Sequence, residues 1–562
     1  RFRIEVISIA GLLAGYLLGL YPAESVFSGF ASPIVITVVE ILLIVQVLAR
    51  AQLFGMLGDR LIAADPPPFI VIAALSGLTM FISIFMNNIG AYAIALPVAL
   101  RIADVTAIPR RQLLIPISFA ALLGGLVSLI GTPANLLVSD ALFRASGQGF
   151  HFFDFAYVGL PVAIIGVLLI AATVLRLFPQ ADDMDVAAPP ERIAGRRMIA
   201  ERRVPHGSPM VGQRLADCQA AFGIKPHALI RNSRFVFGSI EATAIDAGDI
   251  VLAEGLDVIF DELSAKGVLV LESHRDIYAS DVIRSEAVVM PESTLIGSRI
   301  QSLEVFRSRG VAITGLSARS PRIEGRFDDL AISIGDILRL EGPKHAIAEA
   351  LEECECLPLA AAHDHAPPLR SYWPLVIFAC GVLTVAFGLL RPEIAFAGVI
   401  LAMALLNHIN LRSAIADLNW PIIIMLAAMI PLGAAVATTG LAEMLADGLG
   451  ALVPVDRPLF GVALTLFLGM AITPFVNNAT VAIVLSPIGL ALAARAGQSA
   501  NAYLIAVAAG ASLDFLTPFG HHNNTLTMSI GSYRFADFLR AGWLLSIVSY
   551  VLALVLIDWF WI

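Results

Sequence analysis

The charged residues of this chain are concentrated in one central stretch, and the long segments on either side of it carry very few. Charge is sparse over residues 4–178 and 373–562 and dense over residues 182–370. Overall 14% of the residues are charged and 58% are hydrophobic, whereas about a quarter of the residues in soluble domains are charged. This pattern predicts two blocks that lie in a lipid bilayer, with a soluble insert between them.

The overall charge and the cysteines exclude several classes of function. The net charge is −9, and the chain lacks the long basic run or aromatic-basic stripe that nucleic-acid binding requires. The four cysteines, Cys218, Cys354, Cys356 and Cys380, form no disulfide framework. We therefore expect neither a nucleic-acid partner nor an enzyme.

One cluster near the end of the insert has ligands that suit zinc. Cys354-x-Cys356 is followed by His363-x-His365, but this spacing is not a usual finger pattern. The alternative is a linker that runs into Pro367-Pro368. Both interpretations stay open at this stage.

The two apolar blocks are related in sequence. Phe85–Pro97, FMNNIGAYAIALP, matches FVNNATVAIVLSP at Phe475–Pro487, an offset of 390 residues. Upstream, LFGMLGDRL from Leu53 matches LAEMLADGL from Leu441, and Arg3-x-Glu5 matches Arg391-x-Glu393, both at an offset of 388. So many matches at one spacing indicate an internal repeat.

Each repeat contains a hydrophobic hairpin that turns at Asn-Asn. The hairpins run from about residue 69 to 104 and from about residue 458 to 494, long enough to enter a bilayer and return. Asparagine tolerates turn geometry, and its amide can satisfy backbone groups that lipid cannot. We predict two re-entrant hairpins.

Arginine placement predicts the orientation. If the first hairpin is re-entrant, one side of the first repeat carries six arginines and the other carries only Arg144. The basic side is then cytosolic, and so is the insert. We expect a multi-pass protein of the inner (plasma) membrane. Residues 4–20 read as a retained span rather than a signal peptide.

Residues 373–390 precede the Arg391 match in the second repeat, and the first repeat has no corresponding segment before Arg3. We expect one span before residue 1. With it, each repeat crosses the membrane an odd number of times and the second is inverted, as in many alternating-access carriers.

The insert contains its own repeat. Glu201, Val204, Ser208 and Gly212 recur as Glu286, Val289, Ser293 and Gly297, and each copy closes on a Gly-Asp turn that leads into a strand, at Gly248 and at Gly335. Two small α/β modules of this kind resemble the C-terminal ligand-binding domain of potassium-conductance regulators (TrkA-C, or RCK-C). The resemblance implies a regulatory module that binds a small ligand. The alternative is a structural spacer or dimerisation platform.

Each repeat also contains a polar, glycine-rich stretch where a span should be. Residues 124–135 read GGLVSLIGTPAN and residues 513–524 read LDFLTPFGHHNN, with Thr132-Pro133 matched to Thr517-Pro518. Both would break a helix at membrane depth, which is tolerated only where the freed backbone lines a cavity or the protein interior. The freed carbonyls can bind Na⁺, and half-helix N-termini can bind an anion.

With these elements, the chain resembles the divalent-anion:sodium symporter (DASS) family over nearly its whole length, especially the sulfate-associated branch that carries TrkA-C modules. The family's hairpin-tip Ser-Asn-Thr motifs correspond here to Asn87-Asn88-Ile89 and Asn477-Asn478-Ala479. The resemblance implies that Asn88 and Asn478 contact substrate and sodium. The outer positions depart from the motif, which puts the family's dicarboxylate contacts in doubt.

The second break also departs from the family, because His521 and His522 replace residues of the TPIGYQTN pattern. Either histidine could bind an anion or carry a proton, or simply pack. Sodium is expected near Asn88, Gly131, Asn478 and Thr517. The full candidate set for substrate and sodium is Asn87, Asn88, Gly131, Thr132, Asn135, Asn477, Asn478, Thr480, Thr517, Pro518, Gly520, His521, Asn523 and Asn524.

The sequence thus predicts an α-helical polytopic membrane protein with an inverted repeat, broken helices and an inserted α/β tandem. We expect a Na⁺-coupled symporter of a small divalent anion, sulfate ahead of dicarboxylate, without a cofactor and working as a homodimer. The alternatives are an aspartate-type antiporter and an insert-gated ion channel. The expected domains are residues 1–180, 190–275, 276–355 and 371–562, with a linker at 356–370.

Overall fold

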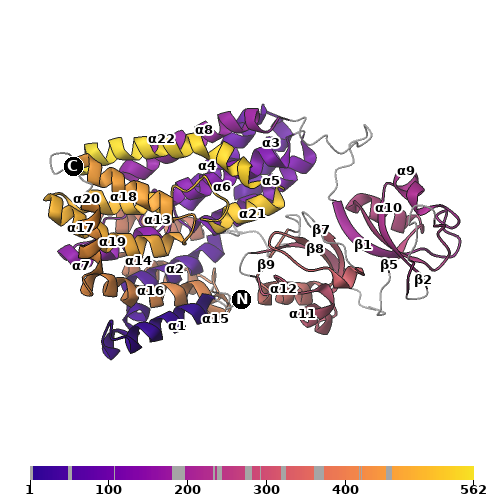
Figure 1. Cartoon of the computed structure of the whole chain (residues 1–562), viewed down its shortest axis with the longest axis horizontal. Coiled ribbons are helices and arrows are strands. Elements are labelled where there is room, and N and C mark those ends of the chain that lie inside the picture. Colours follow the sequence, from indigo (N-terminus) through magenta and orange to yellow (C-terminus); the bar gives the residue numbers. More distant parts are fainter. Residues whose placement is uncertain are drawn as a thin grey trace.

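The computed structural model describes residues 4–48, 53–106, 108–179, 197–231, 234–236, 243–271, 282–290, 293–317, 325–359, 373–416, 418, 420–450 and 458–562. It has a large helical part and a smaller part that contains a β-sheet, which lies beyond one end of the helices (Figure 1). The helical part is formed by the two ends of the chain, and the sheet by its centre.

Apolar helices make up both ends of the chain. The first set is α1 (Ile4–Leu17), α2 (Pro33–Leu48), α3 (Leu53–Ala64), α4 (Pro68–Ser83), α5 (Asn88–Val105), α6 (Arg110–Gly125), α7 (Pro133–Ser146) and α8 (Ala156–Leu177). The second set is α13 (Trp373–Ala386), α14 (Pro392–Leu405), α15 (Leu411–Ala416), α16 (Trp420–Thr438), α17 (Leu441–Gly450), α18 (Pro458–Ile472), α19 (Asn478–Ala496), α20 (Ala500–Gly510), α21 (His522–Ile530) and α22 (Phe535–Trp561).

The sequence repeat pairs helices of the two sets. The matched segments α3 and α17 lie at opposite ends of the helical part, α3 near the sheet and α17 far from it (Figure 1). Equivalent elements at opposite ends are what an inverted repeat requires.

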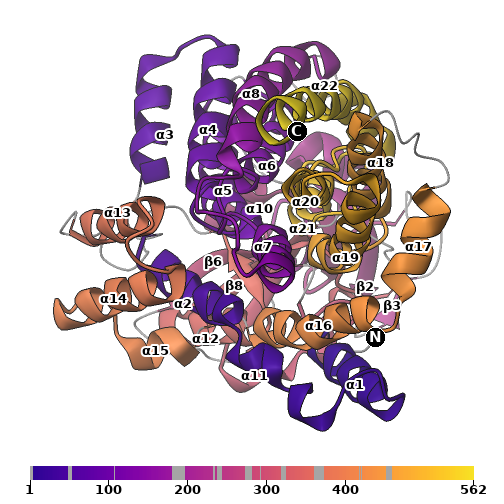
Figure 2. The same ribbon diagram turned by 90° about the vertical axis from the view of Figure 1, so that its left-hand side faces the viewer.

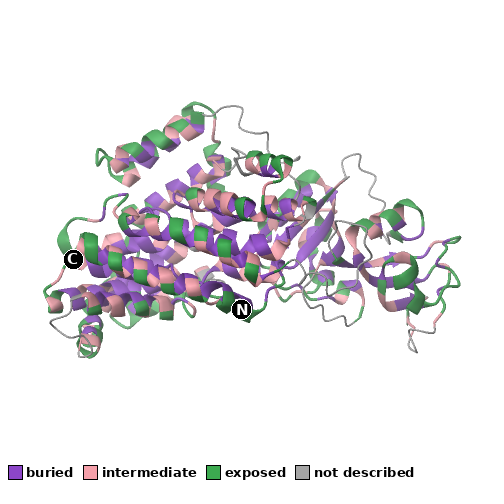
Figure 3. Cartoon of the chain, turned by 90° about the horizontal axis from the view of Figure 1, so that it is seen from above, coloured by how far each residue is buried: buried purple, intermediate pink, exposed green. Residues whose placement is uncertain are grey.

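The outer surface of the helical part is apolar. Along α22, Trp543, Ile547, Val551 and Val555 are each more than half exposed, and a four-residue spacing places them on one helix face. Exposed residues follow the outer sides of the helices while buried residues face inward (Figure 3). Among the described helices, α8, α19 and α22 are each long and apolar enough to cross a membrane. Such a surface is stable only in lipid, and the chain is a membrane protein.

The helices pack in two groups. One group contains α1, α2, α13, α14 and α16, which contact one another. The other contains both hairpins, α4–α5 and α18–α19, together with α6, α7, α8, α20, α21 and α22. Figure 2 shows α1, α2, α14 and α16 in a row beside the second group. We call these the flanking group and the hairpin group.

The central part is one nine-stranded sheet with the order β3-β2-β4-β1-β7-β8-β6-β9, and β5 pairs with β1. The first module contains β1 (Arg197–Arg203), η5 (Leu215–Asp217), α9 (Cys218–Phe222), β2 (Lys225–Arg231), β3 (Arg234–Phe235), β4 (Ile250–Leu256), α10 (Asp257–Ala265) and β5 (Val270–Leu271). The second contains β6 (Val282–Val289), η7 (Ile300–Ser302), α11 (Glu304–Ser308), β7 (Ala312–Ser317), η8 (Phe327–Asp329), β8 (Ile337–Pro343), α12 (Lys344–Glu353) and β9 (Cys356–Pro358).

The two modules repeat the same hydrogen bonds. The Val204 amide donates to the Asp249 carbonyl at 2.8 Å, and the Val289 amide donates to the Asp336 carbonyl at 2.9 Å. In each module the glycine before that aspartate donates back at 2.8 Å. The modules join where Ile199 of β1 pairs with Leu316 of β7.

The candidate zinc cluster falls partly within the second module. Cys354 and Cys356 are buried in its core, and the Ser293 hydroxyl donates to the Cys354 carbonyl at 2.5 Å. Burial raises the pKa of the Cys354 thiol to about 11 and that of the Cys356 thiol to about 12. His363 and His365 lie outside the described residues. The expected linker from residue 356 begins with a strand, β9, because Cys356–Pro358 pairs with β6.

Candidate functional site

Asparagine begins the second helix of each hairpin, as the sequence predicts. Asn87 is the N-cap of α5, and its side chain accepts from the Ile89 amide at 3.3 Å. Asn477 is the N-cap of α19, and its side chain accepts from the Thr480 amide at 2.8 Å. Capping explains why the first asparagine of each pair is needed. The second asparagine of each pair is left to make contacts across the molecule.

Asn88 faces the first break, which lies between α6 and α7. The Ser83 hydroxyl donates to Asn88 Oδ1 at 3.2 Å and to the Ala121 carbonyl at 2.6 Å. A methyl group on Gly125 would lie 2.2 Å from Asn88 Oδ1 and 3.2 Å from the Gly131 carbonyl oxygen. Oxygens of Asn88 and Gly131 therefore lie close to Gly125, and the Gly125 carbonyl oxygen lies close to Gly131. We call these three oxygens the first oxygen pocket.

Asn135 holds the first break in shape. Its Nδ2 donates to the carbonyls of Gly125 at 3.0 Å and Ser128 at 2.8 Å, so it links the end of α6 to the start of α7. The Ser128 hydroxyl donates in turn to the Ile84 carbonyl of the first hairpin. The break is a defined structure, since its freed backbone groups find partners.

Asn478 links the second hairpin to the first break. Its Nδ2 donates to the Thr132 hydroxyl at 3.0 Å, and Thr132 is the N-cap of α7. Through Asn88, Gly131 and Thr132, the N-termini of α5, α7 and α19 meet in one region. Helix N-termini carry positive partial charge and unpaired amides, so this region suits an anion.

Asp514 lies in the second break and was missed as a site residue. Its carboxylate accepts from the Leu516 amide at 3.2 Å and from the Thr517 hydroxyl at 2.9 Å. A methyl group on Gly520 would lie 2.1 Å from Asp514 Oδ2 and 3.1 Å from the Thr473 carbonyl oxygen. Oxygens of Asp514 and Thr473 thus lie close to Gly520, and we call these oxygens the second oxygen pocket. A lone carboxylate within an apolar stretch was the signal that could have identified it.

The two breaks align differently in space than in sequence. Helix α7 begins at Pro133 after Thr132, and α21 begins at His522 after His521. The structural counterpart of Thr132 is therefore His521, and Gly131 corresponds to Gly520, whereas the sequence match paired Thr132 with Thr517. The second break is longer, which shifts the helix start relative to the Thr-Pro pair.

The remaining candidates of the second break position α21. Asn523 Nδ2 donates to the Ser118 carbonyl at 3.0 Å, and the Ser118 hydroxyl donates to Asn524 Oδ1 at 2.6 Å. Pro518 uses its carbonyl to accept from Thr525 at 2.7 Å. The His521 ring is buried, and its Nε2 has no hydrogen-bond partner among the described residues. The hydrogen bonds of Asn523 and Asn524 thus tie α21 to α6, and that of Pro518 holds the start of α21.

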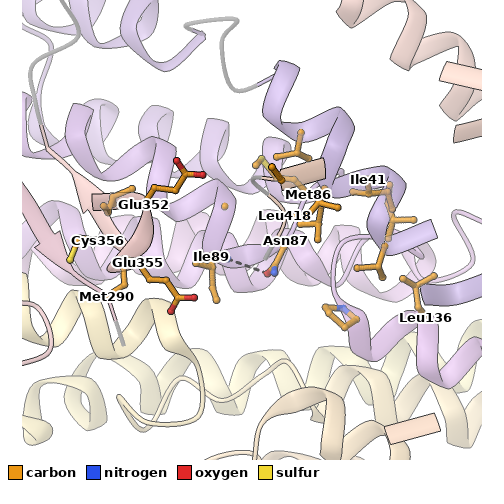
Figure 4. A pocket seen from close by; sticks show the side chains of 18 residues that line it. Ile41, Met86, Asn87, Ile89, Leu136, Met290, Glu352, Glu355, Cys356 and Leu418 are labelled. Carbon is orange, nitrogen blue, oxygen red and sulfur yellow. Dashed lines mark hydrogen bonds between the residues drawn. The ribbon is translucent and has the colours of Figure 1, made fainter. Parts of the chain in front are cut away.

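A cavity opens beside the first hairpin tip (Figure 4). Its volume is about 590 Å³, and it lies between α2, the tip of the first hairpin and the second module. Asn87 and Gly90 form part of its wall, with Ile41 and Val45 of α2 opposite. The cavity connects the hairpin tip with the side of the protein that carries the insert.

The citrate transporter (CitMHS) family profile matches residues 1–510. The chain belongs to the citrate transporter family. Membership agrees with the resemblance to divalent-anion:sodium symporters and confirms that assignment. The family consists of transporters.

Relatives of this citrate transporter family member are similar along all or part of its length. "Uncharacterized transporter YfbS" of Escherichia coli is 29% identical, over 99% of this chain and 96% of that protein. A "Putative sulfur deprivation response regulator" of Chlamydomonas reinhardtii is 25% identical over 95% of this chain and 94% of that protein. "Sodium/sulfate cotransporter 1" of the same alga is 26% identical over 47% of this chain and 32% of its own length.

Proposed function

We propose that this protein is a Na⁺-coupled symporter of a small divalent anion, with sulfate favoured over a dicarboxylate. The observation that supports this proposal is that the first hairpin tip, the first break and the second hairpin tip meet at one junction. There the N-termini of α5, α7 and α19 lie beside the first oxygen pocket. Helix N-termini stabilise an anion, and carbonyl and carboxylate oxygens are the ligands that hard cations prefer. The names of the algal sodium/sulfate cotransporters add support.

The two oxygen pockets are the proposed sodium sites. The first would use Asn88, Gly125 and Gly131, and the second would use Asp514 and Thr473 near Gly520. No arginine lies in either hairpin tip or break. A dianion at this junction would therefore depend on helix dipoles, amides and bound Na⁺ for its neutralisation.

The proposed architecture follows from the same features. Residues 1–180 and 371–562 form two inverted membrane repeats with re-entrant hairpins in the plasma membrane, and the insert is cytosolic. Residues 190–275 and 276–355 form two TrkA-C modules that respond to a small regulatory ligand. The protein works as a homodimer through the flanking group, which leaves the hairpin group free to move.

Uptake into proteoliposomes tests this proposal. With an inward Na⁺ gradient, labelled sulfate should accumulate above its external concentration, and an excess of unlabelled sulfate should compete. Succinate should compete less well. An aspartate-type antiporter would instead require an exchange substrate inside the liposome. An insert-gated channel would let sulfate flow only down its own electrochemical gradient, so a Na⁺ gradient could not make it accumulate.

A further inference from the structure

The second module packs its sheet against the helical part. Along β6, Ala287 and Val289 belong to the core of the module, whereas Val288 between them belongs to the core of the helical part. Val288 is in register with Ile337 of β8 and Leu357 of β9, which pack against the same helical core. One face of this sheet thus holds the module together, and the other face is an apolar docking row.

The Gly335 turn makes a close contact with a helix of the hairpin group. Gly335 has a φ of 78°, and a methyl group on it would lie 2.0 Å from Cβ of Ser529 on α21. The equivalent turn of the first module, at Gly248, has a φ of 90° and nothing within 4 Å. The same turn is therefore docked in one module and open in the other.

The docking row is specific to the second module. By the internal repeat of the insert, the counterpart of Val288 is Arg203, which is exposed. A charged residue at this position would be costly to bury against an apolar helix surface. The two copies have the same fold, so the difference between Val288 and Arg203 points to a contact that only the second module makes.

The docked module faces both helical groups across one cavity. Ile41 and Val45 of α2 line the 590 Å³ cavity from the flanking group. Pro133 lines it from the hairpin group, together with the tip of the first hairpin. Glu352, Glu355 and Cys356 of the second module complete the wall beside Asn87 (Figure 4). Two carboxylates thus line this cavity on the side of the second module.

We propose that the docked second module is a brake, which holds α21 of the hairpin group through the Gly335 turn and the docking row and so restrains the movement of that group against the flanking group. This inference rests on the proposed function. Alternating access requires one helical group to move against the other, and a module that is docked on α21 and stands beside α2 opposes that movement. Release of the module permits transport.

Two glycine variants test the brake. Gly335→Asn keeps the left-handed backbone, which asparagine tolerates, but adds a side chain where Ser529 stands. Gly248→Asn imposes the same backbone cost where space is open, and is the matched control. In full-length protein, Gly335→Asn should raise the initial rate of Na⁺-driven sulfate uptake about fivefold or more. A factor of about five corresponds to the lower end of typical coupling free energies between two sites. Gly248→Asn should behave as wild type.

A second readout does not depend on transport. Val45→Cys places a thiol in the cavity wall, and mass spectrometry can follow its modification by a hydrophilic thiol reagent in purified protein. Gly335→Asn should speed this labelling by a similar factor, and Gly248→Asn should not. Val288→Arg, which copies the first module's residue, should act like Gly335→Asn, with Arg203→Val as its control.

The two readouts separate the brake from the transport function. If wild type takes up no sulfate but Gly335→Asn still speeds labelling of the cavity, the symport proposal fails. The inference that the docked module restrains the hairpin group is then still supported. If wild type transports and Gly335→Asn leaves both uptake and labelling unchanged, or slows both, the module supports the fold and the brake is wrong.

Discussion

Asn88 and Asn478 hold equivalent positions at the two hairpin tips but make different contacts. Asn88 turns Oδ1 toward Gly125 and Gly131, while Asn478 donates Nδ2 to Thr132. We predict that Asn88→Ala mainly weakens Na⁺ dependence and that Asn478→Ala mainly weakens substrate dependence. Loss of a hydrogen bond to a charged group costs roughly 1.5–3 kcal/mol, or about tenfold to a hundredfold in apparent affinity.

Concentration curves for both solutes measure these effects. Each variant should also shift the other solute's curve, because binding linkage is reciprocal. Asn501→Ala, near the start of α20 and outside both tips, serves as the control. Normal insertion with unchanged curves for both solutes in both variants would show that the site lies elsewhere.

Asp514 makes the two oxygen pockets chemically unequal. Its carboxylate accepts a hydrogen bond from the backbone amide of Leu516, two residues later in the chain. In the first break, the Ser128 hydroxyl accepts from the backbone amide of Ile130 in the same way. The second break thus carries a formal negative charge where the first carries a hydroxyl. Asp514→Asn should raise the Na⁺ concentration for half-maximal uptake about tenfold or more. The exposed pair Asp59–Arg101 offers Asp59→Asn as a control that changes little. An unchanged Na⁺ curve in Asp514→Asn would remove Asp514 from the ion site.

Asp336 should make the second module less stable as pH rises. Burial raises the pKa of its carboxyl from 3.8 to about 7, so the folded module disfavours the charged form. The stabilisation is fully present below the unfolded pKa and is lost as pH rises through about 7. Its counterpart Asp249 is instead paired with Arg231 at 2.7 Å.

Asp336→Asn removes this pH dependence, because an amide can still accept from the Ser333 amide. Labelling of the buried Cys354 thiol reports opening of the module in the full chain. Above about pH 8 the variant should label about tenfold more slowly than wild type, and below about pH 4 the two should label alike. Equal labelling at high pH would mean that the Asp336 charge costs the fold nothing.

At the scale of elements, the breaks depend on glycines that bring backbones together. A methyl group on Gly131 would lie 2.6 Å from the Gly125 carbonyl oxygen, within the first oxygen pocket. Gly131→Ala should therefore abolish Na⁺-stimulated uptake or reduce it about a hundredfold. Gly77→Ala, in α4 with nothing within 4 Å, should keep wild-type uptake. Transport by Gly131→Ala at the wild-type rate would exclude the first pocket as an ion site.

The sequence predicted the hairpins and the breaks well, for local reasons. Asn-Asn turns cap helices, and Gly-Thr-Pro cannot continue one, so these elements were visible without a structure. The register of the second break was not visible, because residues 511–521 form a longer break than residues 126–132, and only the start of α21 shows that His521 is the counterpart of Thr132. The docking row was hidden because Val288 reads as ordinary strand alternation until its neighbours across the interface are known.

At the scale of the whole molecule, the arrangement suits a carrier in which one part moves. Both hairpins and both breaks belong to the hairpin group, while α1, α2, α13, α14 and α16 stand beside it. The second module is docked on α21 and lies across a cavity from α2. Under the proposed function, the hairpin group binds the solutes and moves, the flanking group supports it, and the second module controls it.

The central claim is that transport of a dianion is driven by Na⁺. Its most direct test is the accumulation of labelled sulfate in proteoliposomes under an inward Na⁺ gradient, compared with equal Na⁺ on both sides. We predict saturable accumulation above the external concentration that disappears when the gradient is removed or a Na⁺ ionophore is added. Uptake that never exceeds equilibrium, with the same rate in both conditions, would contradict the account.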